Sequence, residues 1–215
     1  MPDLVGLDAA ADPSVWERLG FAVVDRVSTI ARVAIRLGAP GQKISGWALD
    51  GVALDTDIDG LMTTAAPPAA AERARHPNGT VAIDHLVVLS PRPARTIAAL
   101  AAVGLDVRGE RRTNQYGAPY TQTFFRIGRP VLELIGPDTP TDDGPARFFG
   151  LAFTVADLDA TAEFFGDRLG RVKDAVQPGR RIATLRREAG AGLPLAFMSA
   201  GASAVDLQDP GGSGA

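Results

Sequence analysis

The sequence predicts an α+β protein built from repeated βαβββ units. Three observations carry this prediction: β-branched apolar runs alternate with alanine-rich helical stretches, corresponding elements recur at a near-constant spacing, and turn-forming residues cluster between the segments. The chain has 215 residues, 46% of them hydrophobic, which is enough to bury a core in one large domain or two small ones.

The best-defined unit begins at a β-branched run, IDHLVVL, which predicts a strand over residues 83–89. An alanine-rich helix is expected over residues 93–103, ending at Gly104 because glycine favours the position after a helix. Three further strands are expected in the 105–111, 121–127 and 130–135 stretches. The predicted order is therefore β-α-β-β-β.

A following segment repeats this order. It comprises a strand at 151–155, a helix at 157–169 that ends at Gly170, and strands at 171–176, 181–186 and 193–198. Leu86 and Leu151 are 65 residues apart, Gly104 and Gly170 are 66 apart, and Glu133 and Ala196 are 63 apart. An offset that holds across all elements indicates internal duplication. We therefore expect paired modules at 83–136 and 148–199, within a unit that spans residues 81–200.

Residues 1–61 are a candidate for a third, degenerate βαβββ module. The stretch DAAADPSVWERLG at 8–20 aligns with DLDATAEFFGDRLG at 157–170, and strands are expected at 21–27, 31–37 and 43–49. Its first strand would then be cut short at Met1. An unrelated αβ extension is the alternative reading.

Two stretches lack the pattern of a packed element. Residues 62–80 are rich in proline and alanine and predict a linker. The tail at 201–215 is rich in glycine, serine and alanine and predicts disorder.

Composition excludes several classes of function. The net charge is −3, which argues against a nucleic-acid partner. No stretch reaches the roughly 20 apolar residues of a membrane span, and the N-terminus lacks the basic region of a signal peptide, so a cytoplasmic protein is expected. The chain contains no cysteine, so a metal would need histidine or carboxylate ligands, which favours Zn, Fe, Mn, Ni or Mg.

The tandem modules, the IDHLVV strand, the helix that closes in RLG and the VLELIG strand together resemble the vicinal oxygen chelate superfamily. This superfamily includes glyoxalases, extradiol dioxygenases and bleomycin-resistance proteins. The stretches HPNGTVAIDHLVV and QPGRRIATLR are similar to uncharacterised actinobacterial glyoxalase-like proteins. The resemblance implies that two modules form a cupped mixed sheet with the helices outside. It also implies a divalent metal inside the cup, with ligands from the first and fourth strand of each module.

His85 and Glu133 occupy the first and fourth predicted strands of the 83–136 module. Strand alternation places Ile83, His85, Val87 and Leu89 on one face, and Glu133 between Val131 and Ile135 on another. A carboxylate among apolar neighbours needs a partner, which could be His85 with a metal or Arg126. The resemblance assigns both His85 and Glu133 as metal ligands and Glu133 as the catalytic residue.

The second module departs from this ligand pattern. Gly150 stands at the position that corresponds to His85, and Ala196 at the position that corresponds to Glu133. Catalytic metal sites usually have three protein ligands. The third could be His76, Asp50 or Gln122, a residue of a second subunit, or absent together with the metal.

Four further polar residues are candidate substrate contacts. Gln122 and Arg126 lie on the 121–127 strand, where a surface position is the alternative reading. Gln177 and Arg181 belong to QPGRR, a turn in which arginine could bind a carboxylate or phosphate and a solvated rim is the alternative.

These features lead to two functional hypotheses. The first is a glyoxalase-like enzyme with isomerase, lyase or dioxygenase chemistry on a small oxygenated substrate, assisted by a divalent metal acting as a Lewis acid. The second is a metal-free binding or resistance protein of the same fold. A homodimer is expected in either case. A purely structural role for the duplicated sheets is a third, weaker hypothesis.

Overall fold

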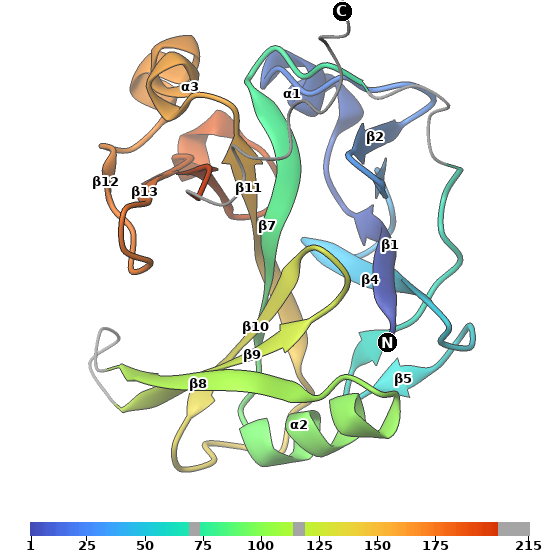
Figure 1. Cartoon of the computed structure of the whole chain (residues 1–215). Helices are drawn as coiled ribbons and strands as arrows, with labels where there is room; N and C mark the ends of the chain where they lie inside the picture. The colour runs from blue at the N-terminus through green and yellow to red at the C-terminus, as the bar shows by residue number, and fades with distance from the viewer. Residues whose placement is uncertain (69–73, 114–118, 202–215) are drawn as a thin grey trace, which may run out of the picture.

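The computed structural model of the chain describes residues 1–68, 74–113 and 119–201. The predicted disordered tail therefore lies outside the described residues, apart from Gly201. The strands form a four-stranded sheet, an eight-stranded sheet and a two-stranded ribbon (Figure 1). Among the described helices, none is long and apolar enough to cross a membrane.

The central module follows the predicted β-α-β-β-β order. Strand β7 is parallel to β10, which pairs with the antiparallel β9, and β8 forms the edge. The elements are β7 (Thr80–Leu89), α2 (Pro93–Ala102), β8 (Val107–Thr113), β9 (Tyr120–Arg126) and β10 (Val131–Pro137).

The C-terminal module repeats this arrangement. Strand β11 is parallel to β14, β14 pairs with the antiparallel β13, and β12 forms the edge. Its elements are β11 (Arg147–Val155), α3 (Leu158–Phe165), the 3-10 helix η1 (Gly166–Arg168), β12 (Lys173–Asp174), β13 (Arg181–Thr184), the 3-10 helix η2 (Arg187–Ala189) and β14 (Leu195–Ser199).

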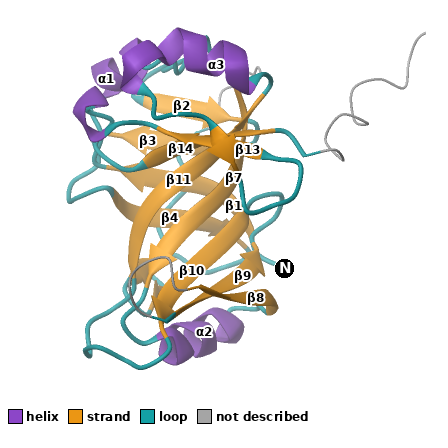
Figure 2. Cartoon of the chain, turned by 90° about the vertical axis from the view of Figure 1, so that its left-hand side faces the viewer, coloured by secondary structure: helices purple, strands orange, loops and turns teal. Residues whose placement is uncertain are grey.

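The two modules join through their first strands. Strands β7 and β11 are antiparallel neighbours, with Leu86 opposite Leu151 and His85 opposite Ala152. In Figure 1, β12 and β13 lie to the left of this central pair and β8 crosses its lower end, with α2 at the bottom and α3 at the upper left. Figure 2 looks at that left-hand side, with the helices at the two ends of the molecule. The predicted α+β fold of tandem βαβββ modules with helices outside is confirmed.

The N-terminal segment has the same element order but a different sheet. It contains β1 (Asp3–Ala9), α1 (Pro13–Arg18), β2 (Val27–Ile30), β3 (Val33–Leu37) and β4 (Ile44–Asp50). Strand β1 is parallel to β3, as β7 is to β10, but β4 pairs antiparallel to the other edge of β1. The ribbon formed by β5 (Asp57–Ile58) and β6 (Leu61–Met62) comes after β4 in the chain.

The expected truncation of the first strand at Met1 is wrong. Residues 3–9 form a complete strand, so the stretch aligned with the helix of the last module is partly β1. The helix starts only at Pro13, because the Asp12 side chain accepts a hydrogen bond from the Ser14 N–H and proline suits the first helical position.

An aromatic cluster joins this N-terminal unit to the back of the eight-stranded sheet. The Phe21 ring lies 4.5 Å from Trp16 and 5.2 Å from Phe153, measured between ring centroids. Phe153 also lies 5.9 Å from Phe197, and Trp16 donates from Nε1 to the Ala191 carbonyl oxygen at 3.1 Å. Trp16, Phe153 and Phe197 are fully buried, so the two sheets share one core.

His76 anchors the predicted linker to the N-terminal unit. Its Nδ1 accepts from the Ala22 N–H at 3.0 Å, so its proton sits on Nε2, which lies 3.1 Å from the Thr29 carbonyl oxygen. Burial lowers the pKa of His76, although the bond to Thr29 opposes this shift. The side chain is therefore neutral, and protonation of Nδ1 would break the bond to Ala22.

This arrangement predicts a loss of stability in mild acid. The unfolded chain takes up a proton at His76 as the pH falls below about 6.5, while the folded chain resists it. The free energy of unfolding should therefore decrease from pH 7.5 to pH 5, with a contribution of at most about 1.4 kcal/mol per pH unit from this one group. Denaturant unfolding of the wild type and His76→Gln across this range measures the difference. If the free energy of unfolding changed equally with pH in the two proteins, His76 would not be the group responsible.

Candidate functional site

The candidate site lies on the face of the eight-stranded sheet that points away from the N-terminal unit. Phe148 and Phe153 of β11 face that unit, where they contact Trp47 and Phe21. Residues directly opposite each other on paired strands share a face, so His85 points with Ala152 to the other side. A network of polar side chains surrounds His85 on this outer face.

A β-bulge brings Asp84 to the same face as His85. The register of β7 against β11 shifts between the His85–Ala152 pair and the Ile83–Phe153 pair, so Asp84 is the extra residue. Ile83 consequently joins Phe153 in the core. The expectation that Ile83 shares a face with His85 is therefore wrong, because strict alternation does not survive a bulge.

Asp84 orients the His85 ring. Its Oδ1 lies 3.0 Å from His85 Nδ1, while its Oδ2 accepts from Thr154 Oγ1 at 3.0 Å and pairs with Arg180. Burial opposes ionisation of Asp84, but the hydrogen bonds from His85 and Arg180 and the charge of Arg180 outweigh it and hold its pKa well below the ordinary value. An ionised Asp84 fixes the His85 proton on Nδ1, which leaves Nε2 free to act as a ligand or base.

Gln122 and Arg111 orient Glu133 from the opposite direction. Arginine only donates, so the Gln122 oxygen must face Arg111, whose Nε lies 2.7 Å away. The Gln122 amide nitrogen then points to Glu133 Oε1 and donates to it. This bond holds the Glu133 carboxylate in place, with Oε2 left for His85.

His85 Nε2 and Glu133 Oε2 face each other at 3.5 Å. Two lone pairs at this separation repel, and a proton or a cation between the two atoms would remove this repulsion. A charge-assisted N–H···O hydrogen bond is about 2.7–2.9 Å long, so a proton fits loosely. Bonds from zinc to nitrogen or oxygen are about 2.0–2.2 Å long, so two ligand atoms of one tetrahedral ion lie about 3.3–3.6 Å apart. The side chains retain 16% and 13% exposure, so solvent reaches them.

The residues proposed as a third ligand do not complete the site. Both ring nitrogens of His76 bond within the N-terminal region, and Asp50 lies beside Pro2 and Gly104. Gln122 uses its oxygen for Arg111. Within residues 1–68, 74–113 and 119–201, no group of three histidine or acidic side chains gathers around one point.

In the C-terminal module, the two positions that correspond to His85 and Glu133 carry no metal-binding side chain. Gly150 and Ala196 have no donor side chains, and a Cβ atom at Gly150 would stand 2.4 Å from the Pro194 carbonyl oxygen. Glycine is therefore required by the close approach of the backbone at Pro194, and a histidine here would need the strands to move apart.

The remaining predicted contacts lie away from His85. Arg126 is exposed and donates to the Arg129 carbonyl oxygen at 3.0 Å. Arg181 is exposed and pairs with Asp159 on α3, and Gln177 is an exposed turn residue whose carbonyl oxygen accepts from the Arg180 N–H.

Sequence reasoning misses three residues that the structure brings into the network. Strict alternation puts Asp84 on the opposite face, and no local pattern links Arg111 to Gln122. The QPGRR pattern allows an arginine to bind a carboxylate, but the predicted contact is Arg181, whereas the structure pairs Arg180 with Asp84. An acidic residue directly before a strand histidine is the available signal for Asp84.

Comparison with solved structures identifies the fold. A mutant of 4-hydroxymandelate synthase from Streptomyces coelicolor matches 92% of this chain and 92% of its own, at 16% identity and a TM-score of 0.61. Methylmalonyl-CoA epimerase from Mycobacterium tuberculosis matches 60% of this chain and 93% of its own, at 15% identity and a TM-score of 0.48. A variant of Streptomyces coelicolor methylmalonyl-CoA epimerase matches 57% of this chain and 96% of its own, at 21% identity and a TM-score of 0.46.

The fold is that of the vicinal oxygen chelate superfamily, as the sequence resemblance implies. No family model matches the sequence, and no curated protein is similar to it in sequence.

Proposed function

We propose that the protein is a glyoxalase-like enzyme whose active site is centred on His85 and Glu133 and takes a divalent metal ion. The observation that carries the proposal is the 3.5 Å separation of His85 Nε2 and Glu133 Oε2, each held in place by its own hydrogen-bonded partners. A carboxylate bonded to the far nitrogen of a ligating histidine is the usual support of such a ligand, and Asp84 supplies it. The nitrogen and oxygen ligands favour Zn, Fe, Mn or Ni, with Mg less suited to imidazole.

The protein side chains have distinct tasks in this proposal. His85 and Glu133 would hold the ion, which when bound supplies Lewis-acid polarisation of substrate oxygens. Glu133 is also placed to accept a proton from a small oxygenated substrate, because Gln122 fixes the direction of its carboxylate. The proposal includes isomerase, lyase and dioxygenase chemistry. A homodimer and a cytoplasmic location stay predictions from the sequence.

A second candidate function is metal-free binding of a small molecule on the same face. It is favoured by Gly150 and Ala196, which leave the site with two protein ligands where durable catalytic sites have three. In this case a proton would lie between His85 and Glu133, and the pair would orient a bound ligand.

Metal analysis of protein purified without a tag distinguishes the metal-binding enzyme from the metal-free binding protein. We expect about one equivalent of a divalent ion per chain in the wild type, and a similar result after titration of the apoprotein with Zn²⁺ or Co²⁺. Glu133→Gln should lose this binding because an amide is a poor ligand for these ions. Glu163→Gln, on the exposed face of α3, is the matched control and should bind as the wild type does.

Two outcomes would overturn the metal proposal. One is a wild type that binds no ion at millimolar concentration, which would leave the binding function as the better candidate. The other is equal binding by the wild type and Glu133→Gln, which would place the ion elsewhere.

A further inference from the structure

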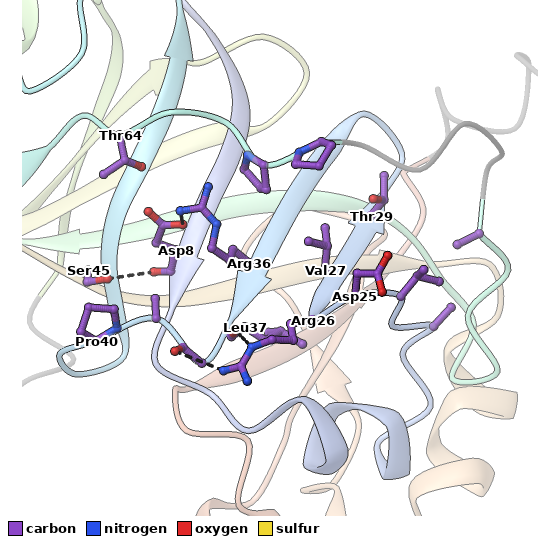
Figure 3. Close-up of a pocket in the computed structure, with 17 residues that line it drawn as sticks. Asp8, Asp25, Arg26, Val27, Thr29, Arg36, Leu37, Pro40, Ser45 and Thr64 are labelled. Carbon is purple, nitrogen blue, oxygen red and sulfur yellow. Dashed lines mark hydrogen bonds and ion pairs between the residues drawn. The ribbon is translucent and has the colours of Figure 1, made fainter.

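A cavity of about 840 Å³ lies on the outer face of the N-terminal sheet, on the far side of that sheet from the shared core. In Figure 3 the labelled residues come from β1, β2, β3 and β4 and from the adjoining turns, which hold Asp25, Arg26 and Pro40, with Thr64 from the following segment above them. Small-molecule sites usually measure about 300–1,000 Å³. The cavity is separate from the His85 site, so a ligand bound in it would be independent of the proposed function.

The cover of this cavity is fixed by close packing. A Cβ atom at Gly6 would stand 2.9 Å from Pro67 Cδ, and one at Gly46 would stand 2.7 Å from Thr64 Cγ2, so only glycine lets the segment lie this close to the sheet. The Thr64 N–H donates to the Trp47 carbonyl oxygen at 2.6 Å. The cavity is therefore enclosed between the N-terminal sheet and the segment around Thr64 and Pro67 that packs closely on it.

The floor of the cavity carries a buried carboxylate. Asp8 of β1 stands opposite Arg36 of β3, and its side chain is only 8% exposed. Arg36 Nη1 lies 3.1 Å from Asp8 Oδ1, but Oδ1 has no hydrogen bond within the described chain. The other terminal nitrogen of Arg36, Nη2, donates a hydrogen bond to the Ala65 carbonyl oxygen at 3.1 Å. Arg36 therefore gives Asp8 a single ion pair, where arginine often gives a carboxylate two parallel bonds.

A buried carboxylate with a single ion pair is stabilised by a further hydrogen-bond donor. An ionised carboxylate has about four acceptor positions, and burial without hydrogen bonds is unfavourable. Apolar and small side chains such as Val24, Val27 and Pro67 line much of the remaining wall. In the turn before β2, the exposed Asp25 and Arg26 also line the cavity and contribute one charge of each sign. The Arg26 side chain donates to the carbonyl oxygens of Leu37 and Gly38.

We propose that this cavity is a second ligand site, specific for a small, largely apolar molecule with a protonated amino group. The amino group would donate to Asp8, and the apolar body would lie against Val27 and the proline cover. The parallel β1–β3 pair would then present a binding face in the N-terminal unit, as the β7–β10 pair does in the central module.

Three probes of nearly equal shape test the charge preference at pH 7. They are 2-phenylethylamine, 2-phenylethanol and 3-phenylpropanoate, titrated into the wild-type protein and followed by two-dimensional NMR. We expect the amine to bind most tightly, with shifts in the amide signals around Asp8 and Arg36. Tighter binding of the carboxylate, or no binding of the amine at millimolar concentration, would overturn the proposal.

Variants of two aspartates that line the same cavity locate the site. Asp8→Asn should weaken amine binding roughly 10- to 100-fold, the range for a hydrogen bond to a charged group, and leave the alcohol little changed. Asp25→Asn removes the same charge from an exposed position and should change amine binding less than about threefold. Equal effects of the two variants would refute the role of Asp8.

A third variant covers the case in which Asp8→Asn does not fold, which its thermal unfolding curve would reveal. Val27 lines the cavity and is partly exposed at the start of β2. Val27→Trp should fill the cavity and abolish binding of the amine and the alcohol together. Unchanged amine binding in a folded Val27→Trp protein would show that the amine binds elsewhere.

Discussion

Phe153→Ala is expected to lower the free energy of unfolding by about 3–5 kcal/mol, the range for removing a fully buried aromatic ring. Phe153 has no exposed surface, and its ring contacts Phe21 and Trp16 of the N-terminal unit as well as Phe197 of β14. The cavity left by the ring would lie where the two sheets meet and could close only by moving one against the other.

Urea unfolding followed by tryptophan fluorescence measures this change, because Trp16 lies 6.4 Å from Phe153. Val176→Ala is the control, since Val176 is 58% exposed and its truncation should cost less than about 0.5 kcal/mol. A loss below about 1 kcal/mol for Phe153→Ala would mean that the N-terminal unit does not pack on the sheet through this ring.

Arg180→Met should destabilise the fold by an amount near the lower end of about 3–5 kcal/mol, the range for removing one partner of a buried ion pair. Arg180 and Asp84 are 15% and 13% exposed, so the variant leaves a largely buried carboxylate without its countercharge. Thr154 and His85 remain as partners of Asp84, which places the effect at the low end.

Two comparisons separate this effect from simple loss of a side chain. The double variant Arg180→Met with Asp84→Asn should recover most of the stability, because the amide needs no countercharge. Arg181→Met removes the neighbouring arginine from an exposed pair with Asp159 and should cost less than about 1 kcal/mol. If Arg180→Met and Arg181→Met were equally mild, the ionised state assigned to Asp84 would be wrong.

The sequence is sufficient to predict the order of elements in the two βαβββ modules, because they repeat at a near-constant offset. The predicted end of the second helix at Gly170 is wrong, because α3 ends at Phe165 and Gly166 follows it, whereas the end of the first helix is predicted correctly. Gly104 has the positive φ of 83° that the helix end requires. The N-terminal sheet is harder to predict. The pairing of β4 with the free edge of β1 is a long-range choice that local patterns do not encode. Sequence alone also places the start of α1 too early, because residues 8–9 belong to β1.

The candidate site is predictable in part. His85 and Glu133 do converge, because they lie on the parallel first and fourth strands of one module, where neighbouring side chains of one face meet. Asp84 cannot be placed from sequence, since a bulge depends on how β7 pairs with β11 rather than on the β7 sequence. The choice between Arg180 and Arg181 likewise depends on which of two adjacent side chains turns inward at the end of a loop.

The aromatic cluster also constrains how the protein is made. Trp16 bonds to a carbonyl group 175 residues further along the chain, and the rings around it come from both ends of the sequence. During translation the N-terminal strands leave the ribosome long before β11 and β14 exist to cover them. Trp16 and Phe21 therefore lack these partners on the nascent chain until β11 and β14 have been synthesised. Packing of this unit on the eight-stranded sheet is consequently a late step of folding, because it depends on contacts between residues far apart in the sequence.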